Sequence, residues 1–408
     1  MSDNMCGIVT KPVSRWAMLA ILCLYVVALV MAFQSIPPIL SLIIEDIGIS
    51  HAQAGLLMSL ITLPGIFLLI PLSLISARFN LKHIGLLSLA LTIFGAIVFM
   101  LARGLPLLML GRLIMGIGTV ALPIVGTQAV AQWFYGHRLG MAMGIYNAAL
   151  MFATIIPLNS FGAIGLEWGW RATLLIVIAI NLIAVILFVR FFRKPPEEPA
   201  STAEKSFTSV KALAKIGWPV WALACGWAFF QAGNLSLTTF LPDFIYTNGL
   251  NLQLAGSITS TMILCTLVLS TPVGYLLDRI RYKEILMIAC SAASLIVIIL
   301  LPLSQNLILL FVIILGISFS PMATATFALV PSLAPHSLMS VAFAIIATMS
   351  YIGMFLGPSL TGLIRDLSGS YQYSFWLIAF FFIAILVLIG ILLRWRMKHQ
   401  EERGTPQD

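Results

Sequence analysis

Charged residues are scarce in this chain. Asp, Glu, Lys and Arg make up only 9% of the 408 residues, whereas hydrophobic residues make up 61%. A soluble domain carries about 25% charged residues, so the composition excludes an ordinary water-soluble protein. The few cations lie in short segments beside apolar runs, which is how charge sets membrane topology. The composition therefore predicts an integral membrane protein whose partner is the lipid bilayer, with no nucleic-acid partner.

Cysteine is equally sparse and has no pattern. The five cysteines stand apart, without a CxxC pair or a spacing typical of a metal site. Four of them fall within apolar runs, where a packing role is expected. The first apolar run is too long for the apolar region of a signal peptide, so we expect no cleaved signal. The sequence predicts no cofactor and no metal.

Catalytic motifs are missing as well. The chain contains no HExxH, no GxSxG and no P-loop, and no carboxylate pair lies within reach inside an apolar run. The segment after Arg394 is far too short for a soluble signalling domain. A membrane enzyme or a sensor is therefore not favoured, and we expect that the protein is not an enzyme.

Twelve apolar runs are long enough to cross a bilayer, which takes about 20 residues each. The expected spans are 16–42, 52–75, 84–101, 107–131, 139–162, 171–192, 218–242, 253–276, 285–302, 307–330, 339–363 and 374–393. The predicted fold class is an all-α integral membrane protein with two six-helix bundles. We expect an N-terminal bundle at 1–192, a cytoplasmic linker at 193–217, a C-terminal bundle at 218–394 and a cytoplasmic tail at 395–408.

A short basic loop occurs twice, about half the chain length apart. GYLLDRIRYK spans Gly274–Lys283, and a weaker version, SLISARFNLK, spans Ser73–Lys82. A feature that recurs once at half-length indicates two copies of one unit. The loop therefore supports a pseudo-twofold relation between the two bundles.

The positions of Lys and Arg predict the orientation. With the N-terminus inside, 18 of the 22 cations fall on the cytoplasmic side, whereas Arg103, Arg171 and Arg365 fall on the other side and Arg112 lies within a span. Cations are enriched in cytoplasmic loops. We therefore expect a multi-pass protein of the cell (cytoplasmic or inner) membrane, with both termini in the cytoplasm.

The six-plus-six arrangement, the basic linker and the loop GYLLDRIRYK together resemble the major facilitator superfamily over nearly the whole chain. In that family, the loop between helices 2 and 3 and the loop between helices 8 and 9 follow the pattern G-x-x-x-D-R-x-G-R-[RK]. The second copy here has Arg281 where glycine is usual, and the first has Ala77 for the acid and Ser73 for glycine. The resemblance implies a cytoplasmic gate, asymmetric because Ala77 is neutral. Its expected residues are Arg78, Lys82, Gly274, Asp278, Arg279 and Lys283.

Two further stretches agree with this resemblance, GRLIMGIG at Gly111–Gly118 and GWR at Gly169–Arg171. IPPIL at Ile36–Leu40 and QAVAQWF at Gln128–Phe134 look most like prokaryotic nitrate- and cyanate-type carriers. The two facing arginines that nitrate carriers place in helices 2 and 8 are absent. The resemblance implies a secondary active or facilitative transporter of a small solute that works by alternating access, with symport as one mode. A coupled proton and a monomeric state are further expectations.

Arg112 is the main candidate for substrate binding, because an ionisable residue inside a span is costly and therefore a functional hypothesis. Its alternative role is structural, with the guanidinium bonded to helix carbonyls. No Asp, Glu or His lies deep in a span, which disfavours organic cations. The favoured substrate is a small organic anion such as a monocarboxylate. The alternative is an exporter of drugs or hydrophobic metabolites.

Further polar and aromatic residues lie in the helices that line the family's substrate cavity. Trp227, Gln231, Asn234 and Thr238 follow one another at helical spacing, so they share a face of helix 7. Such a stripe can bind substrate or join helices, and both interpretations stay open. The other candidates are Thr119, Tyr25, Tyr146, Asn147, Phe319 and Tyr351, for which simple packing is the alternative.

Overall fold

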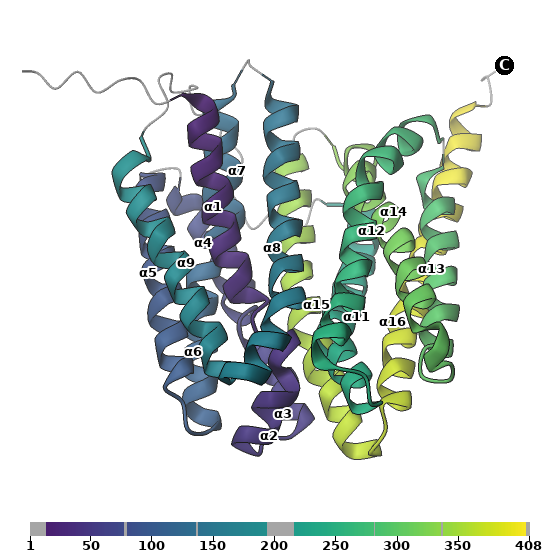
Figure 1. Cartoon of the computed structure of the whole chain (residues 1–408). Coiled ribbons are helices and arrows are strands. Elements are labelled where there is room, and N and C mark those ends of the chain that lie inside the picture. Colours follow the sequence, from purple (N-terminus) through teal and green to yellow (C-terminus); the bar gives the residue numbers. More distant parts are fainter. Residues whose placement is uncertain are drawn as a thin grey trace, which may run out of the picture.

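The computed structural model describes residues 14–76, 80–135, 138–193, 216–280, 282–335 and 338–404. These ranges are almost entirely helical and contain no strand. Figure 1 shows two groups of helices side by side, the first coloured purple to teal and the second green to yellow. The all-helical membrane fold predicted from the sequence is confirmed.

Several spans in the first half are built from two helices. The elements are α1 (Arg15–Phe33), the 3-10 helix η1 (Pro37–Ile39), α2 (Leu40–Ile47), α3 (His51–Leu60), α4 (Leu63–Ser76), α5 (Leu81–Met100), α6 (Leu105–Thr119), α7 (Leu122–Trp133), α8 (Leu139–Trp168) and α9 (Trp170–Phe191). The predicted first, second and fourth spans thus each contain a break, whereas the third, fifth and sixth are continuous.

The helices of the second half are longer and mostly continuous. They are α11 (Trp218–Thr247), α12 (Leu252–Arg279), α13 (Lys283–Leu300), the 3-10 helix η3 (Gln305–Leu307), α14 (Ile308–Leu333), α15 (Met339–Ser368) and α16 (Tyr371–Gly404). Within the described ranges, eleven spans are long and apolar enough to cross a membrane. The remaining predicted span is α11, which is 30 residues long and carries buried polar side chains. Together they give the expected twelve.

The breaks coincide with prolines. Pro37 has no N–H and so cannot bond the Phe33 carbonyl four residues earlier, where α1 ends. Pro64 and Pro123 likewise stand in the first turn of α4 and α7, where a missing N–H is tolerated. In a membrane, each carbonyl freed in this way needs another donor. The breaks therefore create acceptors in the interior of the first half.

The two halves touch at one end of the molecule and separate toward the other. We call the end that contains Phe192 and Ile216 the linker side, and the end that contains the α2–α3 and α11–α12 turns the distal side. On the distal side, α3 packs on α15, and α8 packs on α12. A Cβ at Gly55 would overlap the Pro358 carbonyl, and one at Gly256 would overlap the Leu158 carbonyl.

Toward the linker side α8 and α12 are not in such contact, whereas α4, which follows α3, still packs on α15. A Cβ at Gly144 of α8 or at Gly274 of α12 would meet nothing within 4 Å. The ribbons also spread apart toward this end (Figure 1). Small residues allow helix backbones to approach closely, so Gly55 and Gly256 explain the close approach on the distal side. The structure is thus closed on the distal side.

Candidate functional site

Arg112 lies in the middle of α6 and is completely buried. Its Nε donates to the Leu57 carbonyl (3.2 Å), and Nη1 donates to the Ala32 carbonyl (3.1 Å). Nη2 donates to the Phe33 carbonyl (3.3 Å) and to the Met58 sulfur (3.3 Å). The guanidinium therefore ties α6 to the ends of α1 and α3.

These contacts follow from the helix breaks. The Phe33 carbonyl is freed by Pro37, and the Leu57 carbonyl lies in the last turn of α3. The five N–H donors of arginine suit several such acceptors at once. These partners are all neutral, and among the described residues no carboxylate lies within 4.0 Å of Arg112. The geometry is that of the structural alternative, but the charge stays uncompensated.

The polar stripe of α11 is largely turned into the second half. Gln231 Nε2 donates to Ser350 Oγ of α15 (3.1 Å), and the Thr238 hydroxyl donates to the Asn234 carbonyl (2.8 Å). Asn234 itself is half-buried. Gln231 thus joins two helices of the same half, as polar residues do in bilayers.

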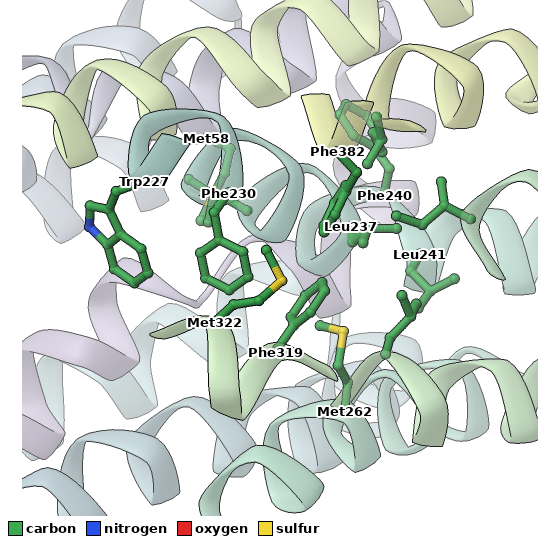
Figure 2. Packing of buried hydrophobic residues seen from close by; sticks show 14 of the residues in the cluster. Met58, Trp227, Phe230, Leu237, Phe240, Leu241, Met262, Phe319, Met322 and Phe382 are labelled. Atoms are coloured by element: carbon green, nitrogen blue, oxygen red, sulfur yellow. The ribbon is translucent and has the colours of Figure 1, made fainter. Parts of the chain in front are cut away.

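Aromatic rings and methionines surround the stripe. Trp227 stacks on Phe230 with ring centroids 5.0 Å apart, and Phe230 meets Phe319 edge to face at 5.0 Å. Phe319 in turn stacks on Phe382. Figure 2 shows these rings together with Met322 and Met262 from neighbouring helices. Phe319 is therefore part of the apolar core of the second half.

The remaining predicted substrate residues fall into different environments. The Tyr25 hydroxyl bonds with Ser88 Oγ (2.9 Å), and the Tyr146 hydroxyl donates to the Leu122 carbonyl (3.4 Å), so both lie inside the first half. Thr119 donates to the Gly116 carbonyl (3.0 Å), whereas Asn147 is exposed. The structure does not bring these four side chains into one site.

Tyr351 lies where the halves meet. It projects from α15, and its ring occupies the space that a side chain at Gly65 of α4 would fill. It packs beside a small buried cluster of Leu69, Val120 and Ile124 from the first half. Of the predicted aromatic candidates, Tyr351 is therefore the one whose ring contacts the opposite half.

The predicted gate is only partly described. Arg78 lies outside the described residues, as do Ala77 and Arg281. Lys82 Nζ donates to the Val189 carbonyl (2.7 Å), and Arg279 lies over the Tyr275 ring at 4.3 Å. Asp278 has no ion pair within 4.0 Å among the described residues, and Lys283 begins α13.

A polar cluster on the distal side was not predicted. His51 of α3 lies between two carboxylates of the second half, with Nε2 3.4 Å from Asp243 Oδ2 and Nδ1 3.3 Å from Asp366 Oδ1. Asp243 is 2% exposed and also accepts hydrogen bonds from Ser41 and Tyr371. His51 and Asp243 fall near the ends of two different expected spans, and nothing in their spacing in the sequence indicates that they meet.

Asp366 extends the cluster to the backbone. Its carboxylate accepts from the N–H groups of His51 (3.0 Å) and Ala52 (2.7 Å), at the start of α3. An acid at this place satisfies free N–H groups and complements the helix dipole. We call His51, Asp243, Asp366, Ser41 and Tyr371 the distal cluster.

The sequence matches a known family profile and known transporters over most of its length. The sequence profile of the Major Facilitator Superfamily matches residues 22–358 and again residues 236–408. The chain is 25% identical to the nitrite extrusion protein of Bacillus subtilis (strain 168), over 94% of this chain and 96% of that protein. It is also 25% identical to the probable nitrate transporter NarT of Staphylococcus haemolyticus (strain JCSC1435), over 89% and 93% of the two chains.

Solved structures with the same fold are more distant in sequence. A bacterial homologue of the human lysosomal transporter Spinster, in an inward-facing and unoccupied conformation, superposes with a TM-score of 0.80 at 18% identity, covering 95% of this chain and 98% of that one. The nucleoside transporter NupG superposes with a TM-score of 0.74 at 14% identity, covering 92% and 98%. The predicted likeness to nitrate-type carriers is confirmed, and the chain belongs to the major facilitator superfamily, a family of membrane transporters and not of enzymes.

Proposed function

We propose that this protein carries a small anion across the cell membrane by alternating access. The observation that supports this is the charge of Arg112, a buried guanidinium whose hydrogen-bond partners are all neutral. At an effective dielectric constant of about 20, a unit charge attracts an anion about 8 Å away by roughly 2 kcal/mol. The same charge repels cations and has little effect on neutral solutes, so it can select anions without direct contact.

The relatives favour an inorganic oxyanion over the monocarboxylate that the sequence suggests. Two of them are named for nitrite extrusion and nitrate transport. A small planar oxyanion would suit a path that has one uncompensated cation and few other polar groups. Nitrite and nitrate are therefore the first substrates to test, with short monocarboxylates next.

We propose that the linker side faces the cytoplasm, because 18 of the 22 cations belong to that side. The conformation described above is then open toward the cytoplasm and closed toward the outside. We also propose that the protein is a monomer. We propose in addition that a proton travels with the anion, because Arg112 stays in the protein and cannot balance the charge that the anion carries across the membrane.

The loop after α12 is proposed as part of the cytoplasmic gate. A Cβ at Gly274 would meet nothing within 4 Å, and Asp278 and Arg279 lie at the linker-side end of α12. When the cytoplasmic side closes, an acid there can pair with cations of the other half. Asp278→Asn should slow transport without lowering the amount of folded protein in the membrane.

The substrate proposal is tested by uptake into proteoliposomes. Labelled nitrite, nitrate, acetate, a neutral sugar and an organic cation are offered to the wild type and to Arg112→Lys. The anions alone should enter, and Arg112→Lys, which keeps the charge, should retain part of the uptake. Arg103→Gln is the matched control, because that arginine is exposed. Uptake of the cation or the sugar, but of no anion, would contradict the proposal.

The apolar cluster around Trp227 and Phe319 favours a second candidate function, export of hydrophobic metabolites (Figure 2). The same proteoliposomes distinguish it. Competition of nitrite uptake by lipophilic cations or neutral aromatics, with direct transport of those compounds, would favour the exporter. Their failure to compete would leave the anion carrier.

A further inference from the structure

We propose that His51, Asp243 and Asp366 form a proton-binding site that is occupied when the distal side of the transporter closes. The three side chains come from both halves, since His51 belongs to α3 and the two acids belong to α11 and α15. The inference rests on the alternating access of the proposed function, but it does not depend on which anion is carried.

The hydrogen-bonding capacity of imidazole carries the argument. Each ring nitrogen of His51 faces a different carboxylate, Nε2 toward Asp243 and Nδ1 toward Asp366, at 3.4 and 3.3 Å. A neutral imidazole has one N–H and one lone pair, so it would turn its lone pair toward one of the two acids. An imidazolium has an N–H on both nitrogens and can donate to both. In the closed cluster, the three side chains therefore hold one more proton than a neutral histidine and two ionised carboxylates would hold.

Other donors place that proton on the histidine. Asp243 accepts from the hydroxyls of Ser41 and Tyr371, and Asp366 accepts from the backbone N–H groups of His51 and Ala52. Donors of this kind stabilise the ionised form of a carboxylate. Both acids are therefore held as anions, and the imidazole is left to carry the proton.

The charges around the cluster agree with this. Arg365 of α15 lies over the ring of Tyr371 at 4.7 Å, and its single positive charge can balance at most one of the two carboxylates. A neutral His51 would then leave a negative charge at the cluster, and that charge is unfavourable at Asp243, which is 2% exposed, whereas Asp366 is exposed. On α2, Ser41 faces the cluster, whereas Asp46 pairs with Arg171 (2.7 Å) and the Glu45 side chain is exposed.

The remaining charged neighbour of α3 is Arg112, and it is too far along the helix to replace the proton. It binds α3 at Leu57 and Met58, which lie about 9 Å further along the axis at 1.5 Å per residue. A protonated His51 therefore neutralises the cluster and connects the two halves through charge-assisted hydrogen bonds.

Opening of the distal side must remove His51 from both acids, because His51 belongs to the first half and both acids belong to the second half. Closing the distal side therefore takes up a proton, so closure is favoured by acid and is lost as the pH rises. With one proton per closure, the ratio of closed to open molecules changes by at most about tenfold per pH unit.

Distances between the halves test the site directly. Spin labels are attached at positions 103 and 303, two exposed distal loop residues of opposite halves, in a variant without the native cysteines and in lipid nanodiscs. From about pH 6 to about pH 8.5, the ratio of short to long distances should fall by at least about tenfold in the otherwise wild-type chain. No anion is added, so a failure of the anion proposal would not affect this result.

Two variants and one control decide the outcome. His51→Gln cannot take up the proton, so its distances should not change with pH. In Asp366→Asn, a neutral imidazole can donate to Asp243 and accept from the new amide, so the distal side should close at every pH. His83→Gln, an exposed histidine of α5, should keep the full pH response.

A pH-independent distance in the otherwise wild-type chain would overturn the site. So would an unchanged pH response in His51→Gln. If His51→Gln does not fold, Asp366→Asn decides alone, because a full pH response there would mean that the proton is bound elsewhere.

Discussion

At the residue scale, two of the predicted substrate-binding residues, Arg112 and Tyr25, are hydrogen-bonded within the first half. Arg112 is bonded to carbonyls of α1 and α3, and Tyr25 is bonded to Ser88 inside the first half. Both therefore stabilise the first half. Arg112 differs because a buried charge still acts at a distance, so we propose that it has an electrostatic role in addition to its structural one.

Arg112→Gln should therefore destabilise the protein as well as weaken anion transport. It removes the Arg112 donors from the carbonyls of Phe33 and Leu57, whereas the Ala32 carbonyl keeps the Ser35 hydroxyl, and an unsatisfied buried polar group costs about 1–3 kcal/mol. The melting temperature of the purified variant should fall clearly, with Arg112→Lys between it and the wild type. An Arg112→Gln protein that melts like the wild type would rule out the structural role.

Tyr25→Phe tests the opposite case, a predicted substrate residue that the structure places inside one half. The substitution removes the hydrogen bond to Ser88, worth about 1 kcal/mol, while Ser88 keeps its bond to the Gly85 carbonyl. We expect a small loss of thermal stability and an unchanged KM for the transported anion. A large rise in KM with normal stability would instead place Tyr25 in the substrate path.

At the element scale, close helix packing defines the state of the transporter. The α3–α15 and α8–α12 pairs meet on the distal side through glycines that lie against backbone carbonyls. On the linker side, the same α8 and α12 carry Gly144 and Gly274 without contacts. One pair of helices thus has a packed end and an open end, as a rocking motion requires.

Gly256→Val should prevent the distal side from closing, because its Cβ would overlap the Leu158 carbonyl. The label pair at positions 103 and 303 should then show mainly long distances, and transport should fall severalfold or more. Gly144→Val is the matched control, since nothing lies within 4 Å of its Cβ position. Short distances in Gly256→Val would mean that α8 and α12 can shift past each other.

At the scale of the whole molecule, charge and shape are separate properties. In the proposed orientation, the linker side, to which the sequence assigns most of the Lys and Arg residues, faces the cytoplasm. The distal cluster, with two acids, one histidine and one nearby arginine, joins the halves at the opposite end. We therefore propose that the linker-side cations set the orientation and that the distal cluster holds the closed side together.

The orientation is checked by cysteine labelling in intact cells, in a variant that lacks the native cysteines. Lys398→Cys on the linker side should be protected from an impermeant maleimide added outside, whereas Arg103→Cys on the distal side should react. Both should react after the cells are opened, which controls for accessibility. The reverse pattern would place the linker side outside the cell.

The sequence alone was sufficient for the fold class and the expected spans, because bilayer-length apolar runs leave few alternatives to transmembrane helices. Eleven of the twelve expected spans are apolar enough on their own, and α11 completes the set. The resemblance to the superfamily could also be seen in the sequence, because the Gly274–Lys283 loop is a motif of neighbouring residues.

Only the tertiary structure decided which polar residues meet. His51, Asp243 and Asp366 lie in three separate segments, and they form a cluster because the distal ends of α3, α11 and α15 converge. The partners of Arg112 likewise depend on where α1 and α3 break, which places the carbonyls of Phe33 and Leu57 beside α6. Hydropathy reports whether a segment enters the bilayer, but it does not report which face of a helix meets which neighbour. Long-range contacts of this kind arise from packing, and they decided both the structural role of Arg112 and the distal cluster.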